Sequence, residues 1–312
     1  MARKRDPACC DIIIPSYNGT SLLNAHIRGI AMLAKDAGRI IVVDDASTDG
    51  SVEMLREKHP NVEVIARKEN GGFSAAANDG IRAAQSDLVL LLNNDVEVAP
   101  GFLEPIVPMF EDESLFAVCP RTILPTRGDL DEGAKTGFWH HGLFYTDQRQ
   151  GVKETVPILY PNGCAAVCRR SMLESLGSFD TAYSPFYWED VDLGYRAWKR
   201  GWKSLYNPVS LVYHQHSASI SRMDAKRTET IKARNSLLFI WRNIEDEGLM
   251  RSHRRWLPLV LARRTVSGDW AFVNGWREAS GMREDADRAR KNDSKHRVLS
   301  DREILRAVGI EI

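Results

Sequence analysis

The first hundred residues alternate between short apolar runs and segments in which apolar residues recur at helical spacing. The predicted strands are 10–14, 39–43, 62–66 and 88–92, and the predicted helices are 22–37, 51–58 and 73–84. Runs this apolar and β-branched are typical of parallel strands that are buried on both faces. The alternation therefore predicts an α/β fold with a mostly parallel central sheet flanked by helices.

The rest of the chain changes character twice. Residues 121–157 are rich in glycine, histidine and aromatic residues and have weak periodicity, which predicts a long excursion with room for a hairpin. A strand entering a helix at 171 and a helix over 190–200 follow, and amphipathic segments begin near 245. The expected organisation is a disordered N-terminus (1–8), one α/β domain (9–243) and a helical, basic C-terminal extension (244–312).

Composition limits the class of protein and its partners. Hydrophobic residues make up 43% of the chain, charged residues make up 27%, and the formal net charge is zero. A chain of this kind is globular, and it has no overall field that would attract nucleic acid. Because no run of about 18 apolar residues occurs, no transmembrane helix is expected. The N-terminus lacks the apolar stretch of a signal peptide, and the five cysteines have no metal-site pairing. We therefore expect a cytoplasmic protein with reduced thiols.

The tail of the chain is basic, because residues 251–312 hold 14 Lys and Arg against 9 Asp and Glu. Tryptophan and arginine residues interleave there, as they do in helices that lie on membrane surfaces. A solvated helical face is the alternative interpretation. Peripheral contact with the inner face of the membrane therefore stays open.

Polar and acidic residues follow three of the predicted strands. Ligands of open α/β sheets bind at the carboxyl ends of the strands. Asp44 and Asp45 could accept hydrogen bonds from a base or a ribose, although an Asx turn or a helix cap is the alternative. Asp95, after Asn93 and Asn94, offers the hard oxygen that Mg²⁺ or Mn²⁺ needs when it bridges a diphosphate, and a turn is the alternative here.

An acidic cluster follows an aromatic run. Glu189, Asp190 and Asp192 come directly after Phe186-Tyr187-Trp188. A carboxylate at a helix start can serve as the general base that takes a proton from an acceptor hydroxyl, and Asp190 occupies that position. First-turn acids that the helix dipole favours are the alternative. That alternative, or an ion pair with Arg196 four residues on, accounts for Asp192.

Two further motifs bear on ligand binding. His214 and His216 would face the same side of a strand, and either could bind a metal or a phosphate, with His214 the better candidate. Asn70-Gly71-Gly72 allows a close backbone approach to a ligand or a tight turn. The chain contains neither GxGxxG nor GxxxxGK[ST], which argues against a dinucleotide fingerprint or a P-loop.

Taken in order, these segments resemble family 2 glycosyltransferases with the GT-A fold, in the bacterial rhamnosyltransferase/galactofuranosyltransferase-like branch. The resemblance covers roughly residues 10–243. The matching segments in this sequence are 14–18 (IPSYN), 43–51 (VDDASTDGS), 70–73 (NGGF), 78–80 (NDG), 92–95 (LNND), 163–166 (GCAA) with 169–170 (RR), 177–180 (GSFD), 189–196 (EDVDLGYR), His214 and 234–235 (RN).

The resemblance implies an inverting transfer from a nucleoside-diphosphate sugar, UDP- or dTDP-linked, to a hydroxyl of a glycan or lipid-linked acceptor. It implies Asp190 as the base, with Glu189 contacting the acceptor or the sugar, and Mn²⁺ or Mg²⁺ at Asp95 and His214. Asn93 and Asn94 stand where the family's metal motif carries acids. The expected donor contacts are Pro15, Tyr17, Asn18, Asp44, Asp45, Asn70, Gly72, Asn78, Asn93, Asn94 and Trp188.

Two other functions remain as alternatives at this point. A nucleotidyltransferase can share a similar sheet, but it would need Lys or Arg in a glycine-rich loop near the N-terminus, and residues 15–19 contain neither. A non-catalytic nucleotide-sugar-binding protein would be expected to lose Asp190 or Asp95, and both are present. The excursion at 121–157, with Trp139-His140-His141-Gly142, is the expected acceptor wall, and an ordinary surface insertion is the alternative.

Overall fold

A computed structural model describes residues 10–33, 38–215 and 224–311. The predicted disordered segment 1–8 and the candidate ligand His216 lie outside these residues. The N-terminal half contains β1 (Cys10–Ser16), α1 (Thr20–Leu33), β2 (Ile40–Asp44), α2 (Ser51–Lys58), β3 (Val62–Ala66), α3 (Phe73–Ala83), β4 (Leu88–Leu92), β5 (Val96–Val98), β6 (Leu115–Leu124), β7 (Leu130–Asp131), β8 (Lys135–His140) and β9 (Leu143–Gln148). The remainder contains β10 (Val156–Pro157), β11 (Ala165–Arg169), α4 (Arg170–Ser175), α5 (Glu189–Lys199), β12 (Lys203–His214), α7 (Ala225–Asn243), α8 (Glu247–Val266), α9 (Trp270–Gly281), α10 (Arg283–Asp293) and α11 (Asp301–Ala307).

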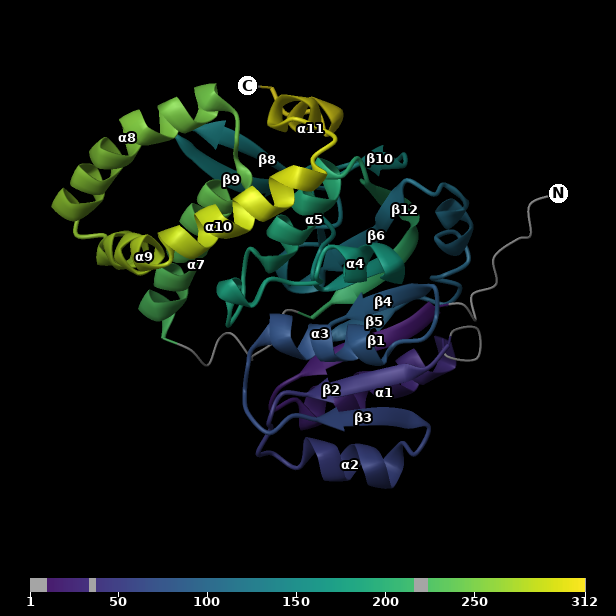
Figure 1. The fold of residues 1–312 in the computed structure, drawn as a ribbon. Helices are drawn as coiled ribbons and strands as arrows, with labels where there is room; N and C mark the ends of the chain where they lie inside the picture. The colour runs from purple at the N-terminus through teal and green to yellow at the C-terminus, as the bar shows by residue number, and fades with distance from the viewer. Residues whose placement is uncertain (1–9, 34–37, 216–223, 312) are drawn as a thin grey trace.

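A single mixed sheet organises the described part of the chain, in the order β10-β12-β6-β11-β4-β1-β2-β3 (Figure 1). The four strands predicted from the first hundred residues pair in parallel, β4 with β1, β1 with β2 and β2 with β3. β11 runs antiparallel to both β4 and β6, so the second half of the sheet is mixed. The expected α/β fold is therefore confirmed, with antiparallel pairs added by the later strands.

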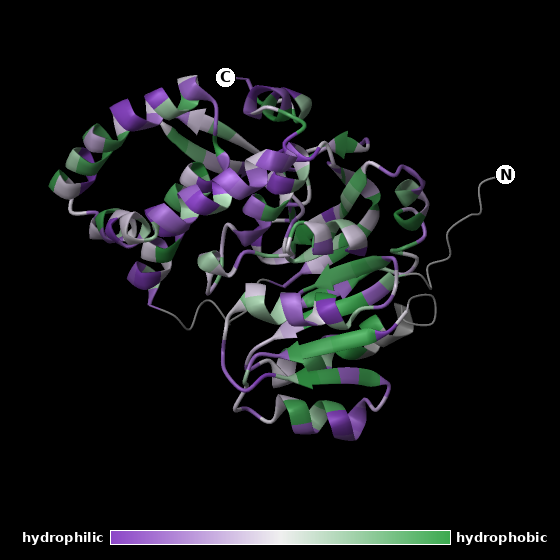
Figure 2. Cartoon of the chain, in the orientation of Figure 1, coloured by the Kyte–Doolittle hydropathy of each residue, from purple (hydrophilic) through white to green (hydrophobic). Residues whose placement is uncertain are grey.

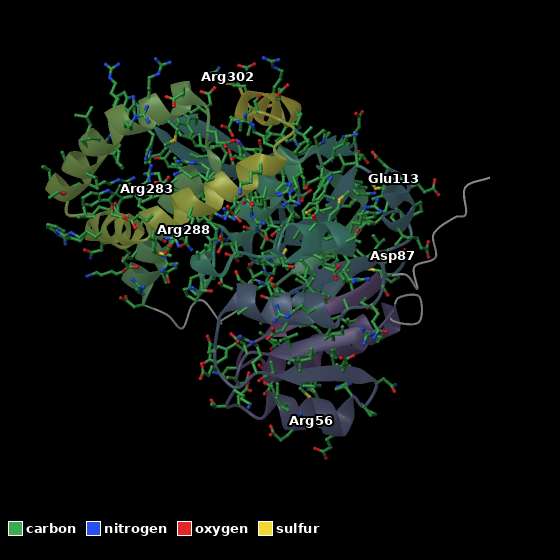
Figure 3. The ribbon with its side chains drawn as sticks, viewed as in Figure 1. Arg56, Asp87, Glu113, Arg283, Arg288 and Arg302 are labelled. Carbon is green, nitrogen blue, oxygen red and sulfur yellow. The ribbon has the colours of Figure 1, made fainter. Side chains whose placement is uncertain are left out.

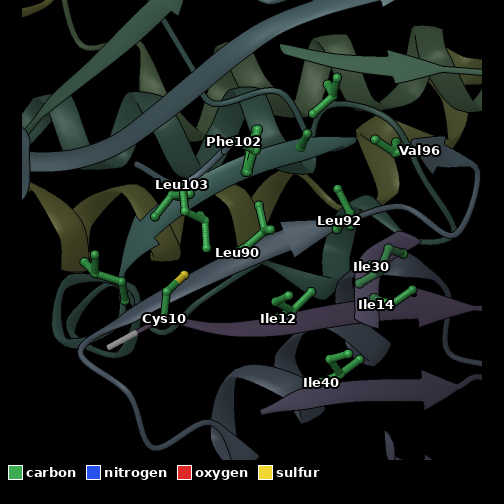
Figure 4. Close-up of a cluster of buried hydrophobic side chains, with 14 of the residues drawn as sticks. Cys10, Ile12, Ile14, Ile30, Ile40, Leu90, Leu92, Val96, Phe102 and Leu103 are labelled. Atoms are coloured by element: carbon green, nitrogen blue, oxygen red, sulfur yellow. The ribbon is translucent and has the colours of Figure 1, made fainter. Parts of the chain in front are cut away.

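Helices cover both faces of the parallel strands. Side chains of β1 alternate between two apolar clusters, because Ile12 and Ile14 join one and Ile13 joins the other. The first cluster contains side chains of α1 and α2, and Figure 4 shows Ile30 of α1 near Ile14, with Leu90 and Leu92 on the neighbouring strand. The second contains α3, α4 and α5. Burial on both faces explains why these strands read as continuous apolar runs (Figure 2).

The C-terminal helices pack on the α/β domain through α7. A third apolar cluster joins Phe144 of β9, Tyr195 of α5 and Phe239 of α7 to Ile304 and Leu305 of α11. Figure 1 shows α8, α9 and α10 grouped around α7 at one end of the molecule. Arg56 on α2 and Arg302 on α11 project from opposite ends (Figure 3). The domain boundary at residue 243 stays a prediction, and the third cluster takes residues from both sides of it.

Two sequence expectations have direct structural counterparts. The excursion at 121–157 contains the hairpin of β8 and β9, paired antiparallel from Lys135 opposite Gln148 to His140 opposite Leu143. Among the described residues, no helix combines the length and the apolar character needed to cross a membrane.

Asp192 connects three elements below the start of α5. Its fully buried carboxylate accepts hydrogen bonds from Tyr183 Oη at 3.1 Å, Asn243 Nδ2 at 2.8 Å and Arg196 Nε at 2.6 Å. The predicted pairing with Arg196 is thus confirmed. Burial alone would raise the pKa of Asp192, but Arg196, Arg242 and Asn243 hold that pKa below its ordinary value.

Replacing Asp192 with asparagine should lower the free energy of unfolding by about 3–5 kcal/mol, because Arg196 is then left buried without its charge partner. In the wild type, this contribution is complete above the ordinary carboxyl pKa and is lost as pH falls through the lowered native pKa. Urea unfolding at several pH values measures both effects. Asp285→Asn, which breaks the exposed pair with Arg288, is the control and should change stability by less than about 0.5 kcal/mol. Equal stability of the two variants would contradict the assignment.

Candidate active site

A cleft of about 1000 Å³ opens where β1, β2 and β4 end. Its volume lies at the upper end of the range of about 300–1,000 Å³ for small-molecule sites, so it has room for two reactants. One half of the cleft is formed by the strand-end loops, and the other by β9, α7 and the start of α9. The residues predicted from the sequence that line it are Pro15, Tyr17, Asn18, Asp45, Asn70, Gly72, Asn93, Asn94, Asp95, Trp188, Glu189, Asp190 and His214.

Asp44 and Asn78, which were expected to contact a donor, do not line the cleft. Asp44 Oδ1 accepts the backbone N–H of Ser47 at 2.9 Å, which is the Asx-turn alternative, while its buried Oδ2 has no hydrogen-bond partner among the described residues. Asn78 pairs with the backbone of Phe179 through both ends of its amide, at 2.8 and 2.9 Å. Asn78 therefore ties α3 to the segment that leads towards α5.

Asp45 has its carboxylate already engaged. It pairs with Arg67 and accepts the backbone N–H groups of Gly71 at 3.0 Å and Gly72 at 2.8 Å. Gly72 has a φ of +82°, and a Cβ there would lie 2.7 Å from the backbone oxygen of Pro185. Only glycine fits this close approach. By accepting both N–H groups, Asp45 fixes this glycine loop against the turn before α5.

An imidazole and a carboxylate meet where β5 joins β12. The antiparallel register places His214 opposite Val96, so that the backbone N–H of Gln215 donates to Asp95 O at 3.1 Å. His214 Nε2 then lies 3.4 Å from Asp95 Oδ2. Burial by itself lowers the pKa of His214, but Cys164, Asp95 and Glu132 raise that pKa to about 12. A cation bound here would have to displace the proton on Nε2, because only a neutral imidazole is a metal ligand. Imidazole nitrogen and carboxylate oxygen suit Mn²⁺, and the oxygen suits Mg²⁺, so the donor set fits the expected cation.

The aromatic turn before α5 has a strained backbone. Tyr187 and Trp188 have φ values of +71° and +76°, a region that large side chains rarely occupy. Asn235 of α7, fully buried, donates through Nδ2 to the backbone oxygens of Tyr183 at 2.7 Å, Phe186 at 3.1 Å and Tyr187 at 2.8 Å. The turn is therefore held by α7, and it delivers residues 189 and 190 to the cleft.

Glu189 and Asp190 are neighbouring acids that both line the cleft. Burial raises the pKa of Glu189 well above its ordinary value, and Asp190 raises it further. Its Oε2 is buried and has no hydrogen-bond partner among the described residues. Burial also raises the pKa of Asp190, although the charge of Lys135 and the N–H of Gly163, 3.2 Å from Oδ2, act in the opposite direction. Such a carboxyl group can exchange a proton nearer to neutral pH.

Sequence reasoning missed several residues of the cleft. Glu132 and Lys135 enter from the excursion, and Phe272 enters from α9. His214 Nδ1 lies 2.8 Å from Glu132 Oε1. The only sequence feature that could have pointed to Glu132 and Lys135 is the group of charged residues at 129–135. No motif in the sequence links that group to a histidine 82 positions after Glu132.

Comparisons with known proteins agree with this architecture. A family model described as Glycosyl transferase family 2 matches residues 11–177. Pre-mycofactocin glycosyltransferase of Mycobacterium tuberculosis is 30% identical over 218 residues, covering 69% of this chain and 44% of that protein. The chain thus spans less than half the length of that relative. N-acetylglucosaminyl-diphospho-decaprenol L-rhamnosyltransferase of the same species is 24% identical over 273 residues, covering 78% of this chain and 87% of that protein.

Two solved structures show the same fold. GalNAc-T7 with UDP, GalNAc and Mn²⁺ has a TM-score of 0.61 at 19% identity, covering 76% of this chain and 48% of that one. Mannosyltransferase PcManGT from Pyrobaculum calidifontis, in complex with GDP-Man and Mn²⁺, has a TM-score of 0.55 at 17% identity, covering 89% and 76%. These likenesses confirm the GT-A fold. Because the family model covers more than half of its residues, the chain belongs to glycosyl transferase family 2.

Proposed function

We propose that this protein transfers a sugar, with inversion, from a UDP- or dTDP-sugar to a hydroxyl of a glycan or lipid-linked acceptor. The observation that carries the proposal is that one cleft contains Asp190, with its raised pKa, and the neighbouring pair of Asp95 and His214. Family membership favours this reading over a nucleotidyltransferase. One relative is named for pre-mycofactocin and another for a decaprenol-linked sugar. These names do not choose between a glycan and a lipid-linked acceptor for this chain.

The strand-end half of the cleft would bind the donor. Tyr17 is exposed there and can contact a flat base, while the loop that Asp45 holds leaves backbone groups at 70–72 near the nucleotide. Asp95 and His214 would hold Mn²⁺ or Mg²⁺, and the bound cation would supply charge neutralisation for the departing diphosphate. Asn93 and Asn94 can contact a ribose or a bound water, as their amides are polar and line the same wall.

Asp190 would take the proton of the acceptor hydroxyl. Its Oδ2 is oriented by the N–H of Gly163 and faces into the cleft between the two halves. Glu189, with an unpartnered buried oxygen beside it, is positioned to accept a hydrogen bond from a sugar hydroxyl. Inversion follows if the acceptor oxygen attacks the anomeric carbon from the side opposite to the diphosphate.

The half formed by β9, α7 and α9 would bind the acceptor. Its wall combines aromatic rings with charged groups, and Phe144, Tyr145 and Phe272 contribute the rings. Sugars and short lipid-linked glycans are recognised by such mixed surfaces, which offer apolar faces and hydrogen-bonding groups together. The hairpin of the excursion at 121–157 supplies residues 143–146 to this wall, whereas residues 139–142, which the sequence favoured, do not line the cleft.

The outer face of α8 would contact the membrane. This helix carries five arginines and one acid, and its exposed side also presents Leu259 and Val266, which are 58% and 91% exposed. Trp270, at the start of α9, is 53% exposed. Figure 3 shows nitrogen-tipped side chains projecting from this side of the molecule. Basic and apolar groups on one face suit an anionic lipid surface, where a lipid-linked acceptor would be found.

Binding of the donor tests the proposal first. UDP or dTDP with Mn²⁺ should raise the melting temperature of the protein, and Asp190→Asn should retain this shift. The same variant should lower kcat about 100- to 10,000-fold, because general-base catalysis contributes about that factor. Nucleotide-sugar turnover assays measure it. Absence of stabilisation by any nucleoside diphosphate, or wild-type turnover in the variant, would refute the proposal.

The charge of Lys135 should set the pH at which Asp190 becomes active as a base. Burial raises the pKa of Asp190 and Lys135 lowers it, so Lys135→Met should raise it further. Because the base must be ionised, the acidic limb of the pH profile of kcat/KM should then move to higher pH. Lys232→Met removes another cleft cation, one that pairs with Glu229, and should leave the limb in place. An unmoved limb in the Lys135 variant would contradict this role.

Membrane contact should depend on the exposed side of α8. Wild-type protein should sediment with vesicles that contain phosphatidylglycerol and not with pure phosphatidylcholine vesicles. The double variant Leu259→Glu, Val266→Glu should sediment at least several-fold less, because both side chains are exposed and now carry charge that opposes the lipid. Glutamine at Arg56 and Lys58 of α2, at the far end of the molecule, lowers the net charge by the same two units and is the matched control. Equal loss in both variants would exclude α8 as the contact.

A further inference from the structure

His214 lies between two carboxylates that come from distant parts of the chain. Its Nε2 is 3.4 Å from Asp95 Oδ2, and its Nδ1 is 2.8 Å from Glu132 Oε1. The two nitrogens are on different edges of the imidazole ring, so the carboxylates hold it from both sides. Glu132 belongs to the short loop between β7 and β8, which no predicted motif included.

We propose that Glu132 is a positioning residue, which accepts the Nδ1–H of His214 and thereby presents Nε2, beside Asp95, to a divalent cation. The proposal rests on the proposed function, since that function requires the cation. Histidine ligands of metals commonly donate their second N–H to a carboxylate, which fixes the tautomer and the ring orientation. The distance of 2.8 Å between Nδ1 and Oε1 is that of a charge-assisted hydrogen bond.

The backbone around Glu132 is fixed, as a positioning role requires. Its N–H donates to Thr122 O at 2.8 Å, and its carbonyl accepts from Asn162 Nδ2 at 3.3 Å. A Cβ on the following residue, Gly133, would collide with the backbone oxygen of Pro120 and the ring of Tyr206. The loop therefore packs too closely for the backbone of Glu132 to shift easily.

The second oxygen of Glu132 is also engaged. Lys135 Nζ lies 3.7 Å from Oε2, and both side chains are largely buried. Lys135 thus helps to hold the Glu132 carboxylate in place beside His214, in addition to its effect on Asp190.

A different arrangement would place a metal on the other edge of the ring. Ligand atoms of Glu132, Cys164 and His214 lie within 4.8 Å of one another, so they could surround an ion by themselves. Glu132 Oε1 is already within hydrogen-bond distance of Nδ1, and Cys164 Sγ is 3.9 Å from the same oxygen. A thiol is also a poor ligand for Mn²⁺ or Mg²⁺, which prefer oxygen. The geometry therefore favours Glu132 as the partner of a ligand.

The sequence of this chain makes such a partner more important. Asn93 and Asn94 leave Asp95 as the one carboxylate of its motif. With fewer protein charges on the cation, its affinity depends more on how well the imidazole is oriented. Glu132 would supply that orientation, together with one negative charge close to the site.

The test measures Mn²⁺ binding to the full chain without donor, by the electron paramagnetic resonance signal of free Mn²⁺. Glu132→Ala should weaken Mn²⁺ binding about 10- to 100-fold, as is typical for loss of such a partner. Glu132→Gln keeps an acceptor for Nδ1–H and should lose less than about tenfold. In ¹⁵N spectra of Mg²⁺-loaded protein, the His214 proton should sit on Nδ1 in the wild type and in the Gln variant. The Ala variant should give mixed tautomers.

The controls separate the alternatives. Cys164→Ser should leave Mn²⁺ affinity within about twofold; a loss as large as that of Glu132→Ala would instead support the three-ligand site and overturn the proposal. Saturating Mn²⁺ should restore turnover to Glu132→Ala, whereas a turnover deficit that metal does not rescue would show a structural role. Wild-type Mn²⁺ affinity in Glu132→Ala overturns the inference alone, since transfer can persist. Absence of transfer with the predicted Mn²⁺ losses would count against the proposed function alone.

Discussion

The hydrogen bonds from Asn235 to the turn before α5 are the constraint on which the cleft depends. Tyr187 and Trp188 adopt positive φ values, each of which costs of the order of 1–3 kcal/mol. One buried amide, whose two N–H groups are shared among three backbone oxygens, offsets part of that cost, at about 0.5–1.5 kcal/mol for each N–H. Without them, the turn would relax, and the carboxylates of Glu189 and Asp190 would leave the cleft.

The two ends of the cleft are positioned by different means. Asp95 and His214 meet because the register of β5 against β12 places His214 opposite Val96, the residue after Asp95. The sheet itself therefore sets the distance between the two side chains. Asp190 is positioned by side chains of helices, through the turn and the Asp192 network beneath it. A sheet that holds the proposed cation-binding end and helices that hold the proposed base would suit a reaction in which the donor stays fixed and the acceptor arrives.

The sequence predicted the features that depend on short patterns of neighbouring residues. The four parallel strands were clear because burial on both faces leaves uninterrupted apolar runs, and Asp95 and Asp190 stood out at element ends. The different roles of Asp44 and Asp45 could not be told from the sequence. Asp44 forms an Asx turn and Asp45 binds a loop 26 residues away, but two adjacent aspartates are compatible with either role. The contact of Glu132 with His214 spans 82 residues and arises only from the fold, so no spacing could reveal it.

The third apolar cluster joins the C-terminal extension to the helix that holds the aromatic turn. Helix α7 carries Asn235 at its middle and, at its end, Asn243, which bonds to Asp192, while its other side packs against α9 and α10. Removing residues 244–312 would take away the packing of α9 and α10 on the very helix that holds the turn. A substitution that loosens this packing would therefore reach the cleft through Asn235 and Asn243, although it lies outside the cleft itself.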